Sequence, residues 1–284
     1  MSGSLTPGIF AAVLLAAGLH AAWNALVKQG GDPYLRLAIV NFTGTLLAVP
    51  FVLFLPPPPP AAWPWLLCSI LTHTAYYWTL GRAYATGDLS FVYPIARGLA
   101  PPLVTLLGSL ALGEVPQART LLGVGLVSLG VSGLALTGGV LRAQPRALAH
   151  ALACGVTIAA YTLSDGIGGR TAGDGVLAYI AWLFLLEAAP FGLFVLWQRR
   201  EELAAGAWRR LGPAVVGGVF ATLAYAIVIW AMSRAPVGQV AALRETSVVI
   251  AAFIGVRLLG EPFGRVRLGC AALVLTGLVL LRLA

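Results

Sequence analysis

Apolar runs of about twenty residues follow one another along most of the chain, separated by short stretches that contain polar residues, Gly or Pro. An α-helix needs about 20 apolar residues to cross the hydrocarbon core of a bilayer. The pattern therefore predicts an all-α integral membrane protein with ten transmembrane helices and short connections. These helices are expected at roughly 7–28, 33–54, 62–84, 89–112, 118–138, 146–165, 174–197, 211–233, 237–259 and 265–283.

Two stretches of the chain, residues 83–114 and 231–261, are near-copies of each other. Each begins with a small-residue turn and continues into an apolar run that contains one arginine, Arg97 or Arg244. Each then ends with Leu-Gly-Glu. Because the copies are separated by about half the chain length, the sequence indicates two similar halves.

The predicted halves are residues 1–143 and 144–284, with five spans in each. Because five is an odd number, the second half would enter the membrane in the opposite sense. Inverted repeats of this kind characterise secondary transporters, which bind their substrate near the midplane between the halves.

The composition supports a membrane protein without nucleic-acid or metal chemistry. Hydrophobic residues make up 59% of the chain and charged residues only 10%, whereas a soluble domain contains about 25% charged residues. The formal net charge of +8 comes from basic residues at the ends of apolar runs. These are the positions of interfacial anchors, so no nucleic-acid partner is expected. The three cysteines lie far apart inside apolar runs, so no metal site or other cofactor is expected.

Basic residues near the span ends also predict an orientation. Twelve of them flank loops that follow odd-numbered spans, and four flank loops that follow even-numbered spans. Cytoplasmic loops have an excess of Lys and Arg. The count therefore places the odd-numbered loops in the cytoplasm and both termini outside. The opening residues lack a basic region, and no cleavable signal peptide is expected.

Polar and aromatic side chains recur at helical spacing inside several spans. His20, Trp23 and Asn24 lie on one face of span one, and His73, Tyr76 and Tyr77 repeat that spacing in span three. Turned inward, such faces would form a cavity suited to a small amphipathic solute. The alternative is that these groups lie at the interface or pair with one another. The candidates for binding substrate are Trp23, Asn24, His73, Tyr76, Tyr77, Tyr93, Tyr161, Tyr225 and Arg244.

Four charged residues lie deep in predicted spans. Arg97 and Arg244 occupy equivalent places in the two copies, and either could hold a substrate carboxylate with two hydrogen bonds. Either could instead pair internally with Glu187 or Glu245. Glu187 is the candidate carboxylate for coupling export to a proton. Glu114, at the end of the first copy, is interpreted as structural.

Three prolines distinguish the first copy from the second. Pro94, Pro101 and Pro102 fall in the predicted span 89–112, and each removes a backbone hydrogen bond, so this helix is expected to bend. The predicted span 237–259 contains no proline. Bending is therefore expected mainly in the first copy.

These features resemble the EamA family of the drug/metabolite transporter superfamily. The resemblance rests on two five-span halves, each with an apolar helix that ends Leu-Gly-Glu, and it covers essentially the whole chain. The aromatic-rich segment 73–78 is most similar to the YddG-type amino-acid exporters. The resemblance implies export of amino acids, aromatic and other neutral ones, across the inner membrane by alternating access. It also implies a cavity formed by spans one, three, four, six, eight and nine. Family members are usually drawn with both termini in the cytoplasm, opposite to the charge count.

Other function classes are also compatible with the sequence. A multidrug or other metabolite exporter would share the fold, and an acidic residue in the cavity would favour cationic drugs. A non-transporting membrane subunit would have no cavity. An enzyme is not expected, because no GxSxG, HExxH, CxxC or P-loop pattern is present. The expected partners are a small-molecule substrate, the lipid bilayer and a proton as candidate coupling ion, with the protein a monomer or weak homodimer.

Overall fold

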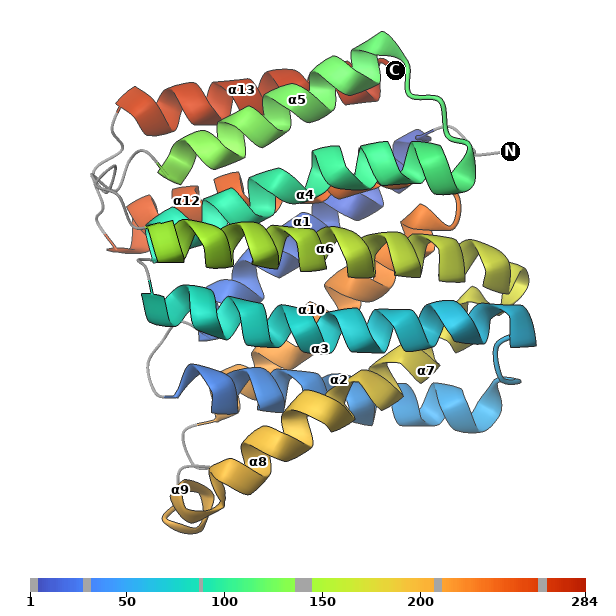
Figure 1. Cartoon of the computed structure of the whole chain (residues 1–284), viewed down its shortest axis with the longest axis vertical. Coiled ribbons are helices and arrows are strands. Elements are labelled where there is room, and N and C mark those ends of the chain that lie inside the picture. Colours follow the sequence, from blue (N-terminus) through green and yellow to red (C-terminus); the bar gives the residue numbers. More distant parts are fainter. Residues whose placement is uncertain (1–4, 28–31, 87–88, 136–144, 207–210, 260–264) are drawn as a thin grey trace.

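The computed structural model describes residues 5–27, 32–86, 89–135, 145–206, 211–259 and 265–284, which form helices and no strand (Figure 1). The helices of the first half are α1 (Pro7–Val27), α2 (Pro33–Phe54), α3 (Trp63–Thr86), α4 (Leu89–Leu112) and α5 (Ala118–Gly133). Those of the second half are α6 (Pro145–Ala172), α7 (Val176–Ala188), α8 (Phe194–Gln198), α9 (Arg200–Ala204), α10 (Gly212–Met232), α11 (Val237–Arg244), α12 (Thr246–Leu259) and α13 (Arg265–Arg282). A π-helical turn, η4 (Ala189–Leu193), joins α7 to α8.

Helical residues occupy each predicted segment within the described ranges, and three segments differ from the prediction. The segment predicted at 174–197 is divided into α7, η4 and α8. The segment predicted at 146–165 continues as α6 to Ala172, and the segment predicted at 237–259 is divided into α11 and α12. Among the described residues, five stretches are long and apolar enough to cross a membrane: Pro7–Leu26, Tyr34–Phe54, Phe91–Leu112, Pro145–Gln198 and Gly212–Met232. The ten-span count and the inverted repeat stay predictions.

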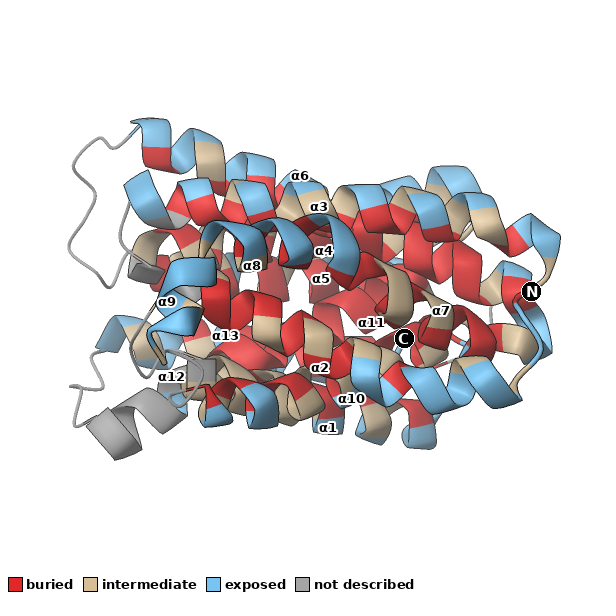
Figure 2. Ribbon diagram, turned by 90° about the horizontal axis from the view of Figure 1, so that it is seen from below, coloured by how far each residue is buried: buried red, intermediate tan, exposed pale blue. Residues whose placement is uncertain are grey.

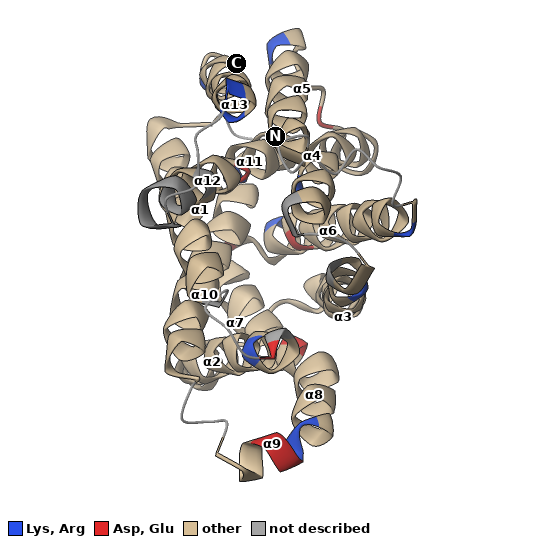
Figure 3. Ribbon diagram, turned by 90° about the vertical axis from the view of Figure 1, so that its left-hand side faces the viewer, with Lys and Arg blue, Asp and Glu red and all other residues tan. Residues whose placement is uncertain are grey.

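From α1 to α6, each α-helix runs in the opposite direction to the one before it in the chain (Figure 1). Seen end-on, α1, α10 and α2 form one row and α4, α6 and α3 face them in another, with α5 and α13 at one edge (Figure 3). Within this arrangement α3 and α4 pack on α6, α1 packs on α10, α2 on α7 and α5 on α13. The start of α1 and the end of α13 lie at the same end of the bundle, where the Arg282 guanidinium carbon is 5.9 Å from the Phe10 ring centre. We call this the terminus-side end.

The outer surface of the bundle is apolar. Exposed positions on the long helices include Leu46, Phe54, Leu110 and Leu275, and charged residues are sparse along the ribbons (Figure 3). Buried positions face the middle of the molecule (Figure 2). An apolar surface of this extent is costly in water and suits contact with lipid chains.

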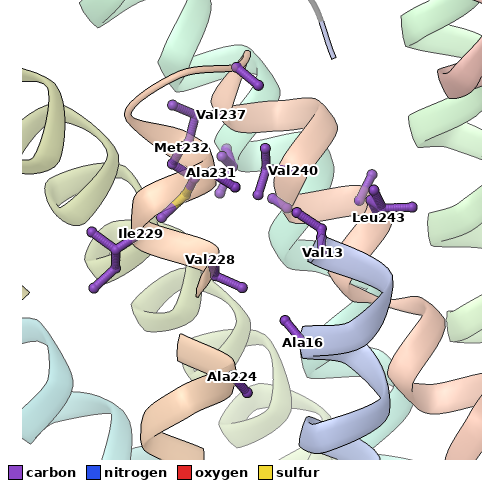
Figure 4. Packing of buried hydrophobic residues seen from close by; sticks show 14 of the residues in the cluster. Val13, Ala16, Ala224, Val228, Ile229, Ala231, Met232, Val237, Val240 and Leu243 are labelled. Atoms are coloured by element: carbon purple, nitrogen blue, oxygen red, sulfur yellow. The ribbon is translucent and has the colours of Figure 1, made fainter. Parts of the chain in front are cut away.

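Small and β-branched side chains allow the helices to approach closely. Where α1, α10 and α11 meet, the core contains Val13 and Ala16 of α1, Val228 of α10, and Val240 and Leu243 of α11 (Figure 4). Packing of this kind is typical of helices in membranes, which associate through shape rather than through the hydrophobic effect.

The two copies of the repeated stretch have different backbones. Helix α4 is continuous through Pro94, Pro101 and Pro102 and ends where Gly113 adopts a positive φ of 65°. The second copy is interrupted at Glu245, whose backbone N–H donates to Ala242 O at 3.1 Å, three residues back. The interruption therefore lies in the span without prolines, residues 237–259, although bending was expected mainly in the span 89–112.

Candidate substrate-binding cavity

A central cavity of about 90 Å³ lies between α1, α2, α3, α6, α7, α10 and α11. Most of the residues predicted to bind substrate meet there. The lining includes Trp23, His73, Tyr76, Tyr77, Tyr161, Tyr225 and Arg244, together with Glu187.

Two predicted residues, Asn24 and Tyr93, are not in this lining. Asn24 donates from Nδ2 to His20 O at 2.8 Å, within its own helix. Tyr93 packs against the hydrophobic core, and its ring centre is 6.0 Å from the Arg97 guanidinium carbon. Both side chains are therefore engaged away from the cavity.

Three aromatic rings from different helices form one wall of the cavity. The His73 ring of α3 stacks on the Tyr161 ring of α6, with centres 4.0 Å apart and planes 20° from parallel. The Tyr225 ring of α10 meets His73 edge-on at 5.5 Å and Tyr161 at 5.8 Å. Such contacts hold large rings in fixed positions, so this wall is a rigid surface on which a solute can rest.

A second wall includes Tyr77, whose hydroxyl is already engaged. It donates to Asn41 Oδ1 at 2.8 Å. The Asn41 Nδ2 atom has no hydrogen-bond partner in the described part of the chain. The free donor on this wall is thus the amide of Asn41, which the sequence reasoning did not select.

The carboxylate of Glu187 gives the cavity an acidic side. Its side chain is buried on α7, and its Oε2 atom is 3.9 Å from His73 Nδ1. Oε2 accepts no hydrogen bond from the described residues. A buried carboxylate oxygen without a donor is costly, so Glu187 has an unused capacity to bind a cationic or hydrogen-bonding group.

Asp165 lies behind the aromatic wall, where it contacts Tyr225. The sequence pattern did not identify it as a candidate. It is fully buried on α6 and accepts hydrogen bonds from the hydroxyls of Tyr179, at 3.0 Å, and Tyr225. Neither Asp165 nor Glu187 forms an ion pair with Arg or Lys among the described residues. The hydropathy pattern ended the predicted span at residue 165, and only the longer α6 places this carboxylate inside the bundle.

The cavity lining also contains a basic residue, Arg244. Arg244, at the end of α11, lies with its guanidinium carbon 5.9 Å from the Tyr225 ring centre, and Nη2 makes a long hydrogen bond of 3.5 Å to Thr162 Oγ1. Its Nε atom has no hydrogen-bond partner among the residues that the structure describes.

The carboxylate of Glu245, which follows Arg244 in the chain, pairs mainly with Arg97 of the other copy. Arg97 Nε donates to Glu245 Oε2 at 2.8 Å, whereas Arg244 Nε is 3.9 Å from Glu245 Oε1. All three side chains are buried. Two guanidinium groups therefore share one carboxylate, and the cluster has an excess positive charge. The internal pairing that the sequence left open is thus found for Arg97, while Arg244 retains an unused donor.

Comparison with known proteins assigns the family. The sequence profile described as the EamA-like transporter family matches residues 6–136 and, a second time, residues 146–283. The chain belongs to the EamA-like transporter family. Members of this family are transporters rather than enzymes, and together with the apolar helices the assignment indicates a multi-pass membrane protein.

Individual relatives are similar to part of this chain, and a solved structure has a similar fold. The proteins named guanidinium exporter of Escherichia coli (strain K12) and of Shigella flexneri are each 32% identical to this chain over 106 residues, 37% of this chain and 98% of the exporter. A solved structure described as "Crystal structure of protein" matches with a TM-score of 0.74 and 18% identity, over 97% of this chain and 95% of that one. At that identity the match supports the fold alone.

No cluster of three or more His, Cys, Asp or Glu side chains lies close enough to hold a metal ion in the described ranges. The described lining residues offer hydrogen bonding, stacking and charge complementarity.

Proposed function

We propose that this EamA-family protein is a secondary transporter of the bacterial inner membrane that exports small solutes by alternating access. In this proposal ten spans form two inverted halves, residues 1–143 and 144–284. Support comes from the two consecutive matches to one family profile and from the packing. Helix α3 (span three) packs on α6 (span six), and α10 (span eight) packs on α1 (span one). Exchanging each span for the span five places away in the chain converts the first pair into the second. Such exchange is expected of an inverted repeat.

Amino acids are the substrate class that the cavity supports best. The single observation behind this choice is that two residues of opposite charge, Glu187 and Arg244, both line the cavity, and that one buried polar atom of each, Glu187 Oε2 and Arg244 Nε, lacks a hydrogen-bond partner among the described residues. A zwitterion needs one group of each sign. Its carboxylate would bind Arg244 and its ammonium Glu187, while its side chain would lie against the His73–Tyr161 wall.

The size of the cavity favours the smaller neutral amino acids in this conformation. Its volume of about 90 Å³ is well below the roughly 300–1,000 Å³ of pockets for drug-sized ligands. Aromatic amino acids, which the family resemblance also implies, would need the rings around the cavity to separate. The same argument disfavours multidrug export in this conformation.

A small organic cation is a second candidate, favoured by a different observation. Two buried carboxylates, Asp165 and Glu187, lack an Arg or Lys partner among the described residues, and the cavity is bounded by the rings of His73, Tyr161 and Tyr225. Cations bind favourably to carboxylates and to aromatic faces. The relatives named guanidinium exporter give an example of such a substrate.

Counterflow in liposomes tests the proposal. Purified protein is reconstituted into liposomes loaded with unlabelled L-alanine, L-phenylalanine or guanidinium, and uptake of the radiolabelled solute is measured. We expect L-alanine counterflow, and we expect Arg244→Lys to slow it about tenfold or more, because Lys cannot reproduce the planar guanidinium. The control is Arg234→Lys, at an exposed position, which should leave the rate unchanged. Absence of counterflow for every solute would contradict the transporter proposal; counterflow of guanidinium alone would favour the second candidate.

A further inference from the structure

A second cavity, of about 520 Å³, lies at the terminus-side end of the bundle. Its lining includes Thr105 of α4, Glu114 and Thr120 around the α4–α5 connection, and Gly238 and Gln239 at the start of α11. Thr105, Thr120 and Gln239 are more than nine-tenths buried, and Gln239 Nε2 donates to Thr120 Oγ1 at 3.1 Å. The volume lies in the usual range of ligand pockets, and the buried lining includes these three polar residues beside apolar ones such as Leu281.

One short helix connects this cavity to the central one. Helix α11 has eight residues, all buried, and spans about 12 Å. Gly238 and Gln239 at its start line the terminus-side cavity, and Arg244 at its end lines the central cavity. A displacement of α11 would therefore change both cavities together.

Helix α11 is pressed against α4 in this conformation. A Cβ added at Gly238 would lie 2.9 Å from Thr105 Cα, closer than side chains normally approach a backbone. The absence of a side chain at Gly238 thus permits the two helices to close on each other between the cavities.

An ion pair holds this closed arrangement at the terminus-side end. Arg170 Nη2, at the end of α6, donates to Glu114 Oε1 at 2.5 Å, and also to Ala235 O at 2.7 Å. Glu114 in turn accepts the first backbone N–H of α11, from Val237, at 3.2 Å. The carboxylate therefore joins the end of α4, the end of α6 and the start of α11.

The Leu-Gly-Glu sequence explains how Glu114 reaches this position. Gly113, with its positive φ, ends α4 and reverses the chain. Glu114 follows at once and points back into the bundle, where its side chain is 9% exposed. The residue interpreted from sequence as structural thus binds a cation and a helix N-terminus contributed by the other predicted half.

We propose that the 520 Å³ cavity is the terminus-side vestibule of the transport path. Glu114 and Arg170 form the latch that holds α11 against α4 and so closes the path between this vestibule and the central cavity. The inference rests on the proposed alternating-access function and adds a gate and a second solute-accessible site to it. When α11 moves away from α4, Arg170 and the start of α11 lose their shared carboxylate. Water in the widened vestibule then solvates all three groups. The solute takes this path between Arg244 and the terminus-side medium.

Labelling of a cysteine in the vestibule tests the latch. Gln239→Cys protein in lipid nanodiscs, where reagents reach both ends, is treated with a membrane-impermeant thiol reagent. Mass spectrometry then follows modification at residue 239 separately from the native cysteines. Adding Glu114→Gln should raise the labelling rate about tenfold, the shift expected when an equilibrium loses one charge-assisted contact. Arg170→Lys should raise the rate in the same direction by a smaller factor.

A carboxylate at the opposite end of the bundle provides a matched control. Asp32 also binds an arginine at 2.5 Å, Arg199, and also caps a helix, α2, by accepting the N–H groups of Tyr34 and Leu35. Asp32→Asn should leave labelling at residue 239 within about twofold of the Gln239→Cys protein.

The outcomes separate the latch from the function. Unchanged labelling in both Glu114→Gln and Arg170→Lys would overturn the latch, as would equal acceleration by Asp32→Asn. If wild-type protein exchanges solute in liposomes but Glu114→Gln leaves the labelling rate at residue 239 unchanged, only the latch proposal fails. If no solute is exchanged at all, the proposed function fails first, and the vestibule with it.

Discussion

Helix α4 and the α11–α12 pair have similar sequences but different structures. Arg97 lies inside a continuous helix, and Arg244 lies at the end of an eight-residue helix. The helical span that contains three prolines is continuous, and the span from Val237 to Leu259, which contains none, is interrupted. Proline is tolerated in membrane helices because neighbouring groups satisfy the freed backbone.

The interruption coincides instead with a buried charge. Glu245 separates α11 from α12, and its carboxylate reaches across to Arg97 of the other copy. A shared ion pair thus ties the interrupted helix to the continuous one. The difference teaches that, in this pair of helices, the place of a break follows the demands of buried charge more closely than the positions of helix-breaking residues.

Removing the shared carboxylate should have the largest effect on this arrangement. Glu245→Ala leaves the guanidinium groups of Arg97 and Arg244 buried without a counter-charge, and we expect a loss of about 3–5 kcal/mol in unfolding free energy. Denaturant titration in mixed micelles measures it. The control is Glu202→Ala, whose side chain is 52% exposed in its pair with Arg199 and whose loss should cost less than about 1 kcal/mol. Similar costs for the two variants would mean that Glu245 does not hold the two copies together.

Filling the contact between the two copies should have an intermediate effect. Gly238→Ala places a methyl group against Thr105, and we expect a cost of about 1–3 kcal/mol with the same titration. Gly125→Ala is the matched control, because a Cβ there meets nothing within 4 Å, and its helix propensity should leave stability equal or higher by up to about 1 kcal/mol. A neutral Gly238→Ala would show that α4 and α11 are less tightly closed than the contact at Thr105 implies.

Replacing a proline of α4 should have the smallest effect. Because the helix already runs through Pro101, Pro101→Ala should change unfolding free energy by no more than about 1 kcal/mol and leave counterflow within about twofold. A tenfold loss of counterflow at unchanged stability would instead place the functional bending in α4, as the proline pattern alone suggested.

The sequence was sufficient for the helical class and for much of the cavity wall. Apolar run length located the helices, and the i, i+3, i+4 faces selected His73, Tyr76 and Tyr77 because those side chains share one side of α3. It was insufficient where partners are distant along the chain. The Arg97–Glu245 pair joins residues that no local pattern connects, and Asp165 was lost because hydropathy ended its helix too early. The break at Glu245 coincides with that same tertiary contact, which the local sequence does not reveal.

The most direct test of the proposed cavity is counterflow of three matched solutes: L-alanine, its amide, which lacks the carboxylate, and propionate, which lacks the ammonium. A cavity lined by both Glu187 and Arg244 predicts rapid exchange of L-alanine and at least about tenfold slower exchange of the other two. Glu187→Gln should remove most of the preference for L-alanine over propionate. Exchange of the amide as fast as L-alanine, unaffected by Arg244→Lys, would contradict the zwitterion site.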